Sequence, residues 1–534
     1  MENHDSASAE ARERIELHRR ALAPVPRWHM LALIGGALAF SVSRLNDGID
    51  LGDEGFMAAC ASRVMDGQVP HRDFYSLQGP LSSVILAGWS TLVGLSFLKL
   101  RVLGALVHTC MALLTYLIAR RLASAHWALA AGAVAILVGL PHMRFAPLPV
   151  WMGLCLSMLA VWLALRSWID GERRIAYLSG MVGAIGMLVR HDQGAYMLVA
   201  ILMLALVMRS WPAAVSRRAS FKLGHWIAGA LTIGVPAFVA AWLLGALPAM
   251  WDQLVLFPLT RYHATSGLPF PMLGQDGPTG SLLAFVLFRL TPLAALITLA
   301  LVAWSYCKGE RSVHSRVGFF LGCWSLCMFT LVMFRSDLAH LVLTMHPMLV
   351  LLAWLAAFME RRFASRPGIR KTLVAGGIAG FGLLAAVAWH VLLLAPERSP
   401  LPIESPFAGV KDRDAEQVNA VVRAIAAATK AGDAILVLPY HPAYYVLADR
   451  RNPTAWGYHW PGDRTEEELR QLIAQAARDA PAAVVIFNRD STVTYLAPVV
   501  QWVEENYVPV DVAADKVIYR PRTPQGYLRG HAAP

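Results

Sequence analysis

Two adjacent acids, Asp53 and Glu54, follow directly on the first long apolar segment of the chain. Apolar side chains recur every four residues from Phe56 onward, which predicts a short helix over 55–66 at the membrane interface, ended by Gly67. A single acid at a helix N-terminus would cap the helix and complement its dipole. Because two acids stand here, with more polar residues close behind, we expect a catalytic role. Those residues are His71-Arg72-Asp73 and Gln78-Gly79-Pro80-Leu81.

The composition places these acids in a membrane protein. Hydrophobic residues make up 56% of the 534 residues, charged residues make up only 16%, and the mean hydropathy is +0.48. A soluble globule of this length is excluded, and an α-helical polytopic membrane protein is predicted. The formal charge of +11 falls mostly in short loops between apolar spans, so it indicates membrane orientation and no nucleic-acid partner. The sequence contains no Gly-rich nucleotide-binding motif and no zinc or disulfide cysteine spacing.

Apolar runs and basic loops predict about eleven membrane crossings, at roughly 20 residues per crossing. The first, 28–46, follows a polar segment 1–27 that we expect on the cytoplasmic side, without a cleavable signal peptide. Residues 81–98 are interpreted as an interfacial or re-entrant helix, because counting them as a crossing would place the later basic loops outside. The remaining spans are 102–119, 127–141, 148–166, 175–189, 195–208, 223–247, 282–304, 317–334, 341–358 and 372–394.

On this count, isolated mixtures of Arg, His and Asp fall in outer loops, on the face that carries Asp53. Ionisable groups near membrane depth are costly, so their recurrence predicts a polar cavity at the outer face of a transmembrane region over 28–394, whose first outer loop is 47–101. For each residue alone, an interfacial anchor or a snorkelling side chain is an equal alternative. The residues are Arg72, Asp73, Arg144, Arg190, His191, Asp192, Arg261, Tyr262, His263, Arg335, Asp337 and His340.

The composition changes after residue 394. A Pro-rich linker is predicted over 395–408, followed by a small α/β domain over 409–534, which lies outside the membrane because the number of crossings is odd. The expected strands are 434–439, 483–487 and 516–520, and the expected helices are 412–430, 465–479 and 499–506. A loop over 441–461 is rich in rings, which either stack on sugars or fix the domain to the membrane. They are Tyr444, Tyr445, Trp456, Tyr458, His459 and Trp460.

One stretch resembles the first outer loop of the GT-C superfamily of glycosyltransferases, which use polyprenyl-phosphate sugars. The resemblance rests on Asp53-Glu54-Gly55, Gly67, Pro70, Arg72-Asp73-Phe74 and Gly79-Pro80-Leu81. It covers about residues 28–394 and is specific mainly at 52–81, with relatives among the family 39 protein mannosyltransferases and the aminoarabinose transferases of lipid A. It implies that Asp53 is the catalytic acid and Glu54 its companion. The mannosyltransferases have Pro-Pro where this chain has Gly79-Pro80, and the C-terminal region looks like neither relative's.

The hypothesis is an inverting glycosyltransferase at the periplasmic face of a bacterial inner membrane, with the N-terminus cytoplasmic and the C-terminal domain periplasmic. Asp53 would take the proton from an acceptor hydroxyl while that hydroxyl attacks the sugar of a polyprenyl-phosphate donor. The acceptor is a lipid, a glycan or a protein. Arg190, Arg261 and Arg335 are expected to bind the leaving phosphate, helped by histidines. The histidines are His191, His263 and His340.

Three alternatives stay open. A divalent metal, Mg²⁺ or Mn²⁺, on Asp53 and Glu54 is one addition to the mechanism, although two acids do not complete an octahedral shell. A lipid or sugar transporter or flippase would also need many spans and buried charges, but it would place them near the midplane and would show repeated halves, which the sequence lacks. A non-catalytic membrane partner that presents its outer domain is the third.

Overall fold

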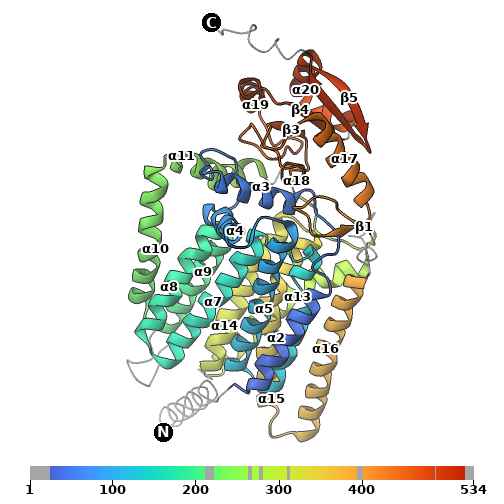
Figure 1. The fold of residues 1–534 in the computed structure, drawn as a ribbon. Coiled ribbons are helices and arrows are strands. Elements are labelled where there is room, and N and C mark those ends of the chain that lie inside the picture. Colours follow the sequence, from blue (N-terminus) through green and yellow to red (C-terminus); the bar gives the residue numbers. More distant parts are fainter. Residues whose placement is uncertain are drawn as a thin grey trace.

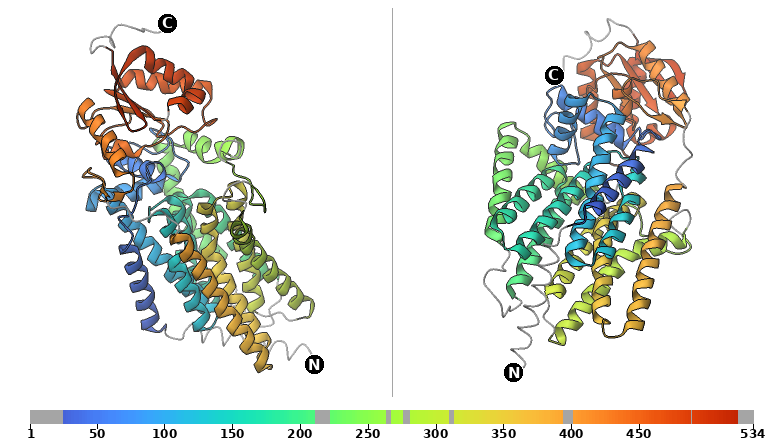
Figure 2. Two further views of the ribbon diagram at one scale, coloured as in Figure 1. Left: turned by 90° about the vertical axis from the view of Figure 1, so that its right-hand side faces the viewer. Right: turned by 60° about the horizontal axis from the view of Figure 1, so that its bottom comes forward.

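The computed structural model describes residues 25–210, 222–262, 267–275, 281–309, 313–393, 401–487 and 489–522. In this part of the chain, helices form a membrane bundle, and a small α/β domain sits on one end of it (Figure 1). The N-terminal segment 1–24, His263 and residues 395–400 of the expected linker lie outside the described residues. The two rotated views show the same arrangement, with the domain over one end of the bundle (Figure 2).

Each expected span is a helix in the structure. Seven helices of the described chain are long and apolar enough to cross a membrane, namely α5, α7, α10, α13, α14, α15 and α16, while the full number of crossings stays a prediction. The bundle helices are α2 Arg27–Val42, α5 Phe97–Leu122, α6 Ala125–Leu137, α7 Pro149–Asp170, α8 Arg173–Val189, α9 His191–Ser210, α10 Leu223–Leu243, α13 Leu282–Cys307, α14 Val313–Phe334, α15 Leu338–Arg362 and α16 Pro367–Leu393.

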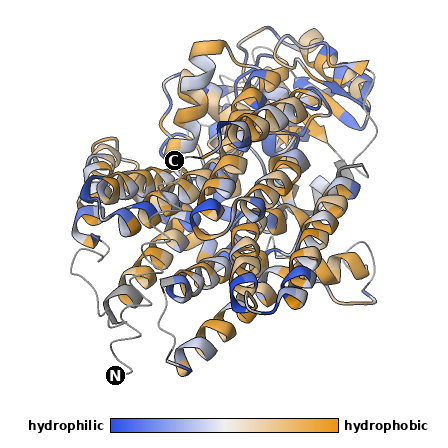
Figure 3. Cartoon of the chain, turned by 90° about the horizontal axis from the view of Figure 1, so that it is seen from below, coloured by the Kyte–Doolittle hydropathy of each residue, from blue (hydrophilic) through white to orange (hydrophobic). Residues whose placement is uncertain are grey.

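Local sequence signals explain where several of these helices begin and end. Ser96 and Ser281 cap α5 and α13 by accepting a backbone N–H, and Pro149 occupies the first turn of α7, where no N–H is missed. Helix α15 lies in the middle of the bundle, with 78% of its apolar window buried. The corresponding share for α10 and α16 is 11%, so most of the residues in their apolar windows are not buried within the protein. Seen from below, hydrophobic residues occupy much of each bundle helix (Figure 3).

The first outer loop folds into two helices at the end of the bundle that faces the C-terminal domain (Figure 1). They are α3 Asp53–Met65 and α4 Pro80–Val93. The predicted helix and its stop are confirmed, since Gly67 has φ +83° just beyond α3. Every residue from Glu54 to Ala61 is buried, because the C-terminal domain covers α3 on one side and α4 packs on the other. Helix α3 therefore contacts protein rather than lying open at the membrane interface.

The C-terminal domain is built on a mixed four-stranded sheet in the order β3-β4-β6-β5. Strand β3 (Ile435–Leu438) runs parallel to β4 (Ala483–Phe487), and β6 (Lys516–Pro521) is antiparallel to β4 and to β5 (Tyr507–Ala513). The three expected strands are confirmed. Strand β5 was not predicted, because it is a mostly exposed edge strand that contains Pro509 and so lacks the alternation of a half-buried strand. The helices are α17 Ala415–Ala428, α18 Ala443–Leu447, α19 Glu466–Asp479 and α20 Arg489–Asn506.

The domain is docked tightly on the bundle. One hydrophobic cluster runs through both, from Phe56 of α3 to Tyr444 of α18. Residues 401–408, which were expected to be linker, are ordered: β1 (Leu401–Pro402) pairs with β2 (Lys411–Asp412), and the Phe407 carbonyl accepts the backbone N–H of Phe97 at 2.9 Å. The Arg63 guanidinium donates to the carbonyl of Thr454 at 2.8 Å. The domain is therefore positioned to contribute to a site at this end of the bundle.

Candidate active site

Asp53 is the first residue of α3, yet it does not cap the helix. The Asp50 carboxylate accepts the backbone N–H groups of Gly52 and Asp53, at 2.9 and 3.1 Å. Capping is thus supplied from outside the acid pair. The carboxylate of Asp53 instead accepts a hydrogen bond from the Tyr440 hydroxyl, at 3.1 Å. Asp53 is exposed, and its side chain opens into a cavity between the bundle and the C-terminal domain.

Glu54 points the other way and is held in a buried ion pair. Both of its carboxylate oxygens accept from the Arg101 guanidinium, at 2.6 and 2.7 Å, and the exposed fractions of the two side chains are 1% and 0%. Arg101 also donates to the carbonyls of Leu45, Asp47 and Gly48, which precede α3. Glu54 does not line the cavity. Through Arg101, Glu54 instead holds in place the segment that leads into α3.

The cavity at Asp53 has a volume of about 340 Å³. Its walls come from three places: α3 and the end of the loop that leads into α4, the ends of the bundle helices that face the C-terminal domain, and the C-terminal domain itself. The residues that line it are Asp53, Phe56, Met57, Leu77, Gln78, Met143, Leu148, Pro149, Val150, Trp151, Arg190, Tyr262, Arg335, Asp337, Ala339, His340, Leu343, Tyr440, Tyr458, Trp460 and Asp463. The cavity therefore combines a carboxylate, guanidinium groups and aromatic rings.

Two guanidinium groups in the cavity are held in the same way. Arg190 lies between α8 and α9 and donates from Nε and Nη2 to the carboxylate of Asp192, at 2.8 and 2.9 Å. Arg335 lies between α14 and α15 and donates from Nε to Asp337 at 2.7 Å. In both cases the partner is two residues further along the chain. Arg190 also contacts the Gln78 amide oxygen across the cavity. These bonds orient each guanidinium and leave it charged beside the cavity.

Asp337 contacts both Arg335 and His340 at the start of α15. Its carboxylate caps the helix by accepting the backbone N–H of His340 at 2.9 Å, and it lies 2.7 Å from Nδ1 of the His340 ring. Burial opposes ionisation of this carboxyl, but the hydrogen bonds and charges of His340 and Arg335 outweigh it and lower the pKa of Asp337 to about 2. Asp337 is therefore ionised at neutral pH and keeps Arg335 and His340 in place.

Asp53 has the opposite tendency. The carboxylate of Asp53 is reached from the cavity, but the protein groups crowded around it displace much of its solvent, and this desolvation raises its pKa; the nearby charge of Asp50 raises the pKa further. The Tyr440 hydrogen bond and the charges of Arg335 and His340 lower it, but by less. A carboxylate with a raised pKa is a better proton acceptor than an ordinary aspartate.

The remaining predicted residues lie outside the cavity. Arg261 forms an ion pair with Glu468 of the C-terminal domain at 3.0 Å, and Arg72 pairs with the adjacent Asp73 at 2.8 Å. The Arg144 side chain packs against Gly48. His191 and Asp192 follow Arg190 without reaching the cavity lining. Of the predicted set, the structure thus brings together six residues: Asp53, Arg190, Tyr262, Arg335, Asp337 and His340.

The sequence matches no family model and no curated protein. Solved structures do match. ArnT from Cupriavidus metallidurans in the apo state aligns with a TM-score of 0.56 at 14% identity, over 92% of this chain and 97% of that chain. The same protein bound to undecaprenyl phosphate aligns with a TM-score of 0.53 at 15% identity, over 94% of this chain and 99% of that chain. The Archaeoglobus fulgidus oligosaccharyltransferase tethered with an acceptor peptide aligns with a TM-score of 0.52 at 11% identity, over 93% of this chain and 74% of that chain.

This chain has the GT-C fold. The resemblance read from residues 52–81 is thereby confirmed at the level of fold, as is the polytopic membrane architecture.

Sequence reasoning missed several residues that line the cavity of this GT-C fold. Tyr440 was absent from the predicted aromatic set, although it follows β3 at its carboxyl end, where parallel strands commonly present functional groups. Asp463 was also missed, whereas Gln78 was named only as part of the polar motif behind the acids, without a role in the site. Of the aromatic residues named from the sequence, Tyr458 and Trp460 line the cavity. The other four are buried inside the domain, so their role is packing: Tyr444, Tyr445, Trp456 and His459.

The groups at the acid pair do not fit a divalent metal. A hard divalent cation needs several oxygen ligands, and both oxygens of Glu54 already bind Arg101. Among the described residues, no group of three or more His, Cys, Asp and Glu side chains is placed to hold a metal ion. We therefore derive no step through a metal.

Proposed function

We propose that this chain is an inverting glycosyltransferase of the GT-C type, which moves a sugar from a polyprenyl-phosphate donor to an acceptor hydroxyl. The observation that carries the proposal is the single cavity that brings Asp53 together with the guanidinium groups of Arg190 and Arg335. A base and a phosphate-binding pair are the two functions that this reaction needs. ArnT bound to undecaprenyl phosphate and the Archaeoglobus AglB in complex with a dolichol-phosphate have the same fold, which supports a lipid-phosphate donor here.

In the proposed step, the acceptor hydroxyl lies against Asp53. Its proton passes to the carboxylate of Asp53 while its oxygen forms a bond to the anomeric carbon from the face opposite the phosphate. The bond between that carbon and the phosphate oxygen breaks, and its electron pair stays on the phosphate. The raised pKa of Asp53 favours the proton transfer, and holding the two substrates in one cavity supplies the proximity.

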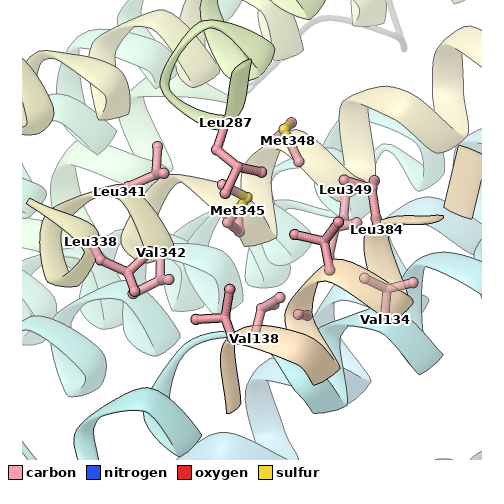
Figure 4. A pocket seen from close by; sticks show the side chains of 13 residues that line it. Val134, Val138, Leu287, Leu338, Leu341, Val342, Met345, Met348, Leu349 and Leu384 are labelled. Atoms are coloured by element: carbon pink, nitrogen blue, oxygen red, sulfur yellow. The ribbon is translucent and has the colours of Figure 1, made fainter. Parts of the chain in front are cut away.

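The departing polyprenyl phosphate gains negative charge, which Arg190, Arg335 and His340 stabilise. Asp337 and Asp192 keep the two guanidinium groups oriented, so little reorganisation is needed when the charge develops. An apolar pocket between α6, α13, α15 and α16 lies next to this region (Figure 4). It begins at Leu338, directly after Asp337, and its lining is hydrocarbon and thioether throughout. These features suit a phosphate that carries a prenyl chain.

The orientation follows from where the basic residues lie. The paired arginines that end α5 and α15 stand at the opposite ends of these helices from the cavity: Arg120 and Arg121, and Arg361 and Arg362. Cytoplasmic loops are enriched in Lys and Arg. We therefore assign the cavity and the C-terminal domain to the periplasmic face of a bacterial inner membrane, and the N-terminus to the cytoplasm.

The test is a transfer assay with the purified chain in lipid nanodiscs and a panel of radiolabelled polyprenyl-phosphate sugars. Wild-type protein should consume one donor, and Asp53→Asn should lower the rate by about 10²-fold or more. Asp66→Asn is the matched control, because Asp66 is an exposed acid at the other end of α3 and does not line the cavity. Movement of donor across vesicles by wild type and Asp53→Asn alike, with no sugar transferred, would establish the transporter alternative instead.

A further inference from the structure

The C-terminal domain gives the cavity a wall of different chemistry from the bundle wall. Three aromatic rings meet there: the ring centroid of Tyr440 lies 4.8 Å from that of Trp460 and 5.9 Å from that of Tyr458. Asp463 is the fourth domain residue in the lining. Trp460 remains 39% exposed, although it is among the largest side chains of the domain. A tryptophan face left open inside a polar cavity is a place for a ligand.

Local structure fixes this wall firmly. Trp460-Pro461-Gly462-Asp463 is a turn in which the Asp463 N–H donates to the Trp460 carbonyl at 3.1 Å, with Gly462 at φ +79° as a type II turn requires. The turn directs the first and last side chains to the same cavity. The backbone N–H of His459 donates to the carbonyl of Pro439 at 2.7 Å, which ties the turn to the residue before Tyr440.

We infer that Tyr440, Tyr458, Trp460 and Asp463 form the acceptor subsite, and that the acceptor is a carbohydrate. The inference rests on the proposed transfer reaction. Aromatic faces stack on the C–H faces of sugar rings, and a carboxylate accepts hydrogen bonds from their hydroxyl groups.

The position of the wall identifies it as the acceptor side. In an inverting displacement the attacking oxygen and the leaving phosphate occupy opposite faces of the anomeric carbon. The guanidinium groups come from the bundle, whereas the rings come from the domain that covers it (Figure 1). Tyr440 connects the wall to the base, because its ring contacts Trp460 and its hydroxyl donates to Asp53. A sugar stacked on Trp460 therefore places a hydroxyl near Asp53.

The experiment measures binding without donor, so it does not depend on turnover. Wild-type chain in nanodiscs is titrated with chitobiose, cellotriose and maltotriose, and with an uncharged Ala/Gly hexapeptide, by saturation-transfer NMR and calorimetry. We expect at least one oligosaccharide to bind and the hexapeptide not to bind. Trp460→Ala should weaken that binding by about tenfold or more. Trp460→Phe, which keeps a ring, should stay within about threefold of wild type.

Trp251→Ala is the matched control, because Trp251 is a 60% exposed tryptophan of α11 (Leu247–Trp251) that does not line the cavity. Unchanged melting temperatures show that the variants are folded. If Trp460→Ala is not folded, Trp460→Leu, which also lacks a ring, takes its place and should show the same loss of binding. The inference is overturned if no oligosaccharide binds wild type, if the hexapeptide binds in their place, or if Trp460→Ala binds as wild type does. If Asp53→Asn instead transfers sugar as fast as wild type in the transfer assay, the proposed reaction is overturned and not the acceptor subsite.

Discussion

The Tyr440 hydroxyl and the Asp53 carboxylate are joined by a 3.1 Å hydrogen bond across 387 positions of the chain. One residue belongs to the membrane region and the other to the C-terminal domain. Because the carboxylate is the acceptor, the bond stabilises its ionised form and opposes the effect of burial on its pKa. The two parts of the protein thus set the basicity of Asp53 together.

This relationship predicts a pH effect. Asp53 must be ionised to accept a proton, so kcat/KM should fall as the pH drops through the pKa of Asp53. Tyr440→Phe removes a group that lowers this pKa, and the acidic limb of the profile should therefore move to higher pH. The measurement is kcat/KM against pH for both proteins. A limb that stays in place, or moves to lower pH, would contradict the assignment of Asp53 as the base.

Glu54→Gln should lower the free energy of unfolding. It leaves Arg101 buried without its counter-charge, and breaking such a pair by removing one partner typically destabilises by about 3–5 kcal/mol. The melting temperature should fall clearly, whereas Arg423→Gln, which breaks the exposed pair with Glu404, should change it little. Activity per folded molecule decides the role of Glu54. A loss as large as that of Asp53→Asn in fully folded protein would show that Glu54 takes part in the chemistry.

Two arginines of similar exposure should behave differently. Arg335 (31% exposed) lines the cavity, whereas Arg261 (28% exposed) is paired with Glu468 outside it. Arg335→Gln should raise the donor KM or lower kcat/KM about tenfold or more, the usual effect of losing a hydrogen bond to a charged group. Arg261→Gln should leave donor kinetics within about twofold, since the loss of a partly exposed ion pair has a small effect. Steady-state kinetics on both variants checks this, and equal losses would argue against the phosphate assignment.

Gly52→Ala should loosen the docked domain. A Cβ at this position overlaps the Tyr440 ring, so Tyr440 or α3 must move. Overpacking of this kind destabilises by about 1–3 kcal/mol. Gly88→Ala is the control, because that position in α4 has open space around it. Limited proteolysis near residue 394 and the melting temperature report the difference. Identical behaviour of the two variants would mean that the domain does not press on Gly52.

Metal removal should have no effect on the rate. Both oxygens of Glu54 bind Arg101, and among the described residues no group of three or more His, Cys, Asp and Glu side chains is placed to hold a divalent ion. Activity should persist in EDTA and should not rise on adding Mg²⁺ or Mn²⁺. Loss of activity in EDTA, with recovery on adding either ion, would reinstate the metal-bound alternative.

Periodicity and hydropathy were enough to locate the bundle helices, which are long apolar runs, and the helix at 53–65 and the three inner strands, which bury apolar side chains. Periodicity and hydropathy did not predict the different roles of Asp53 and Glu54. These roles depend on Arg101, which stands 47 residues away at the start of a long apolar helix, where a sequence pattern gives it no partner. Only the packed structure brings the two together.

Sequence patterns also failed to separate the roles of the arginines near the cavity. Arg261 and Arg335 stand in similar mixtures of Arg, aromatic or Ser, and acidic or His neighbours. Their different roles follow from Glu468, on α19 of the C-terminal domain, which holds Arg261 outside the cavity. Likewise, the aromatic loop was recognised, but which of its rings face the cavity depends on the turn at Pro461-Gly462.

Backbone hydrogen bonds join Gly48 and Asn46, which precede α3, to Lys411 of the C-terminal domain, and they have a consequence for biosynthesis. During translation, Asp53 leaves the ribosome more than 350 residues before Lys411, Tyr440 and Trp460, which complete its surroundings. A nascent or truncated polypeptide therefore carries Asp53 without Tyr440 or Trp460 beside it. The cavity around Asp53 can therefore be completed only after the C-terminal domain has been synthesised and has docked on the bundle.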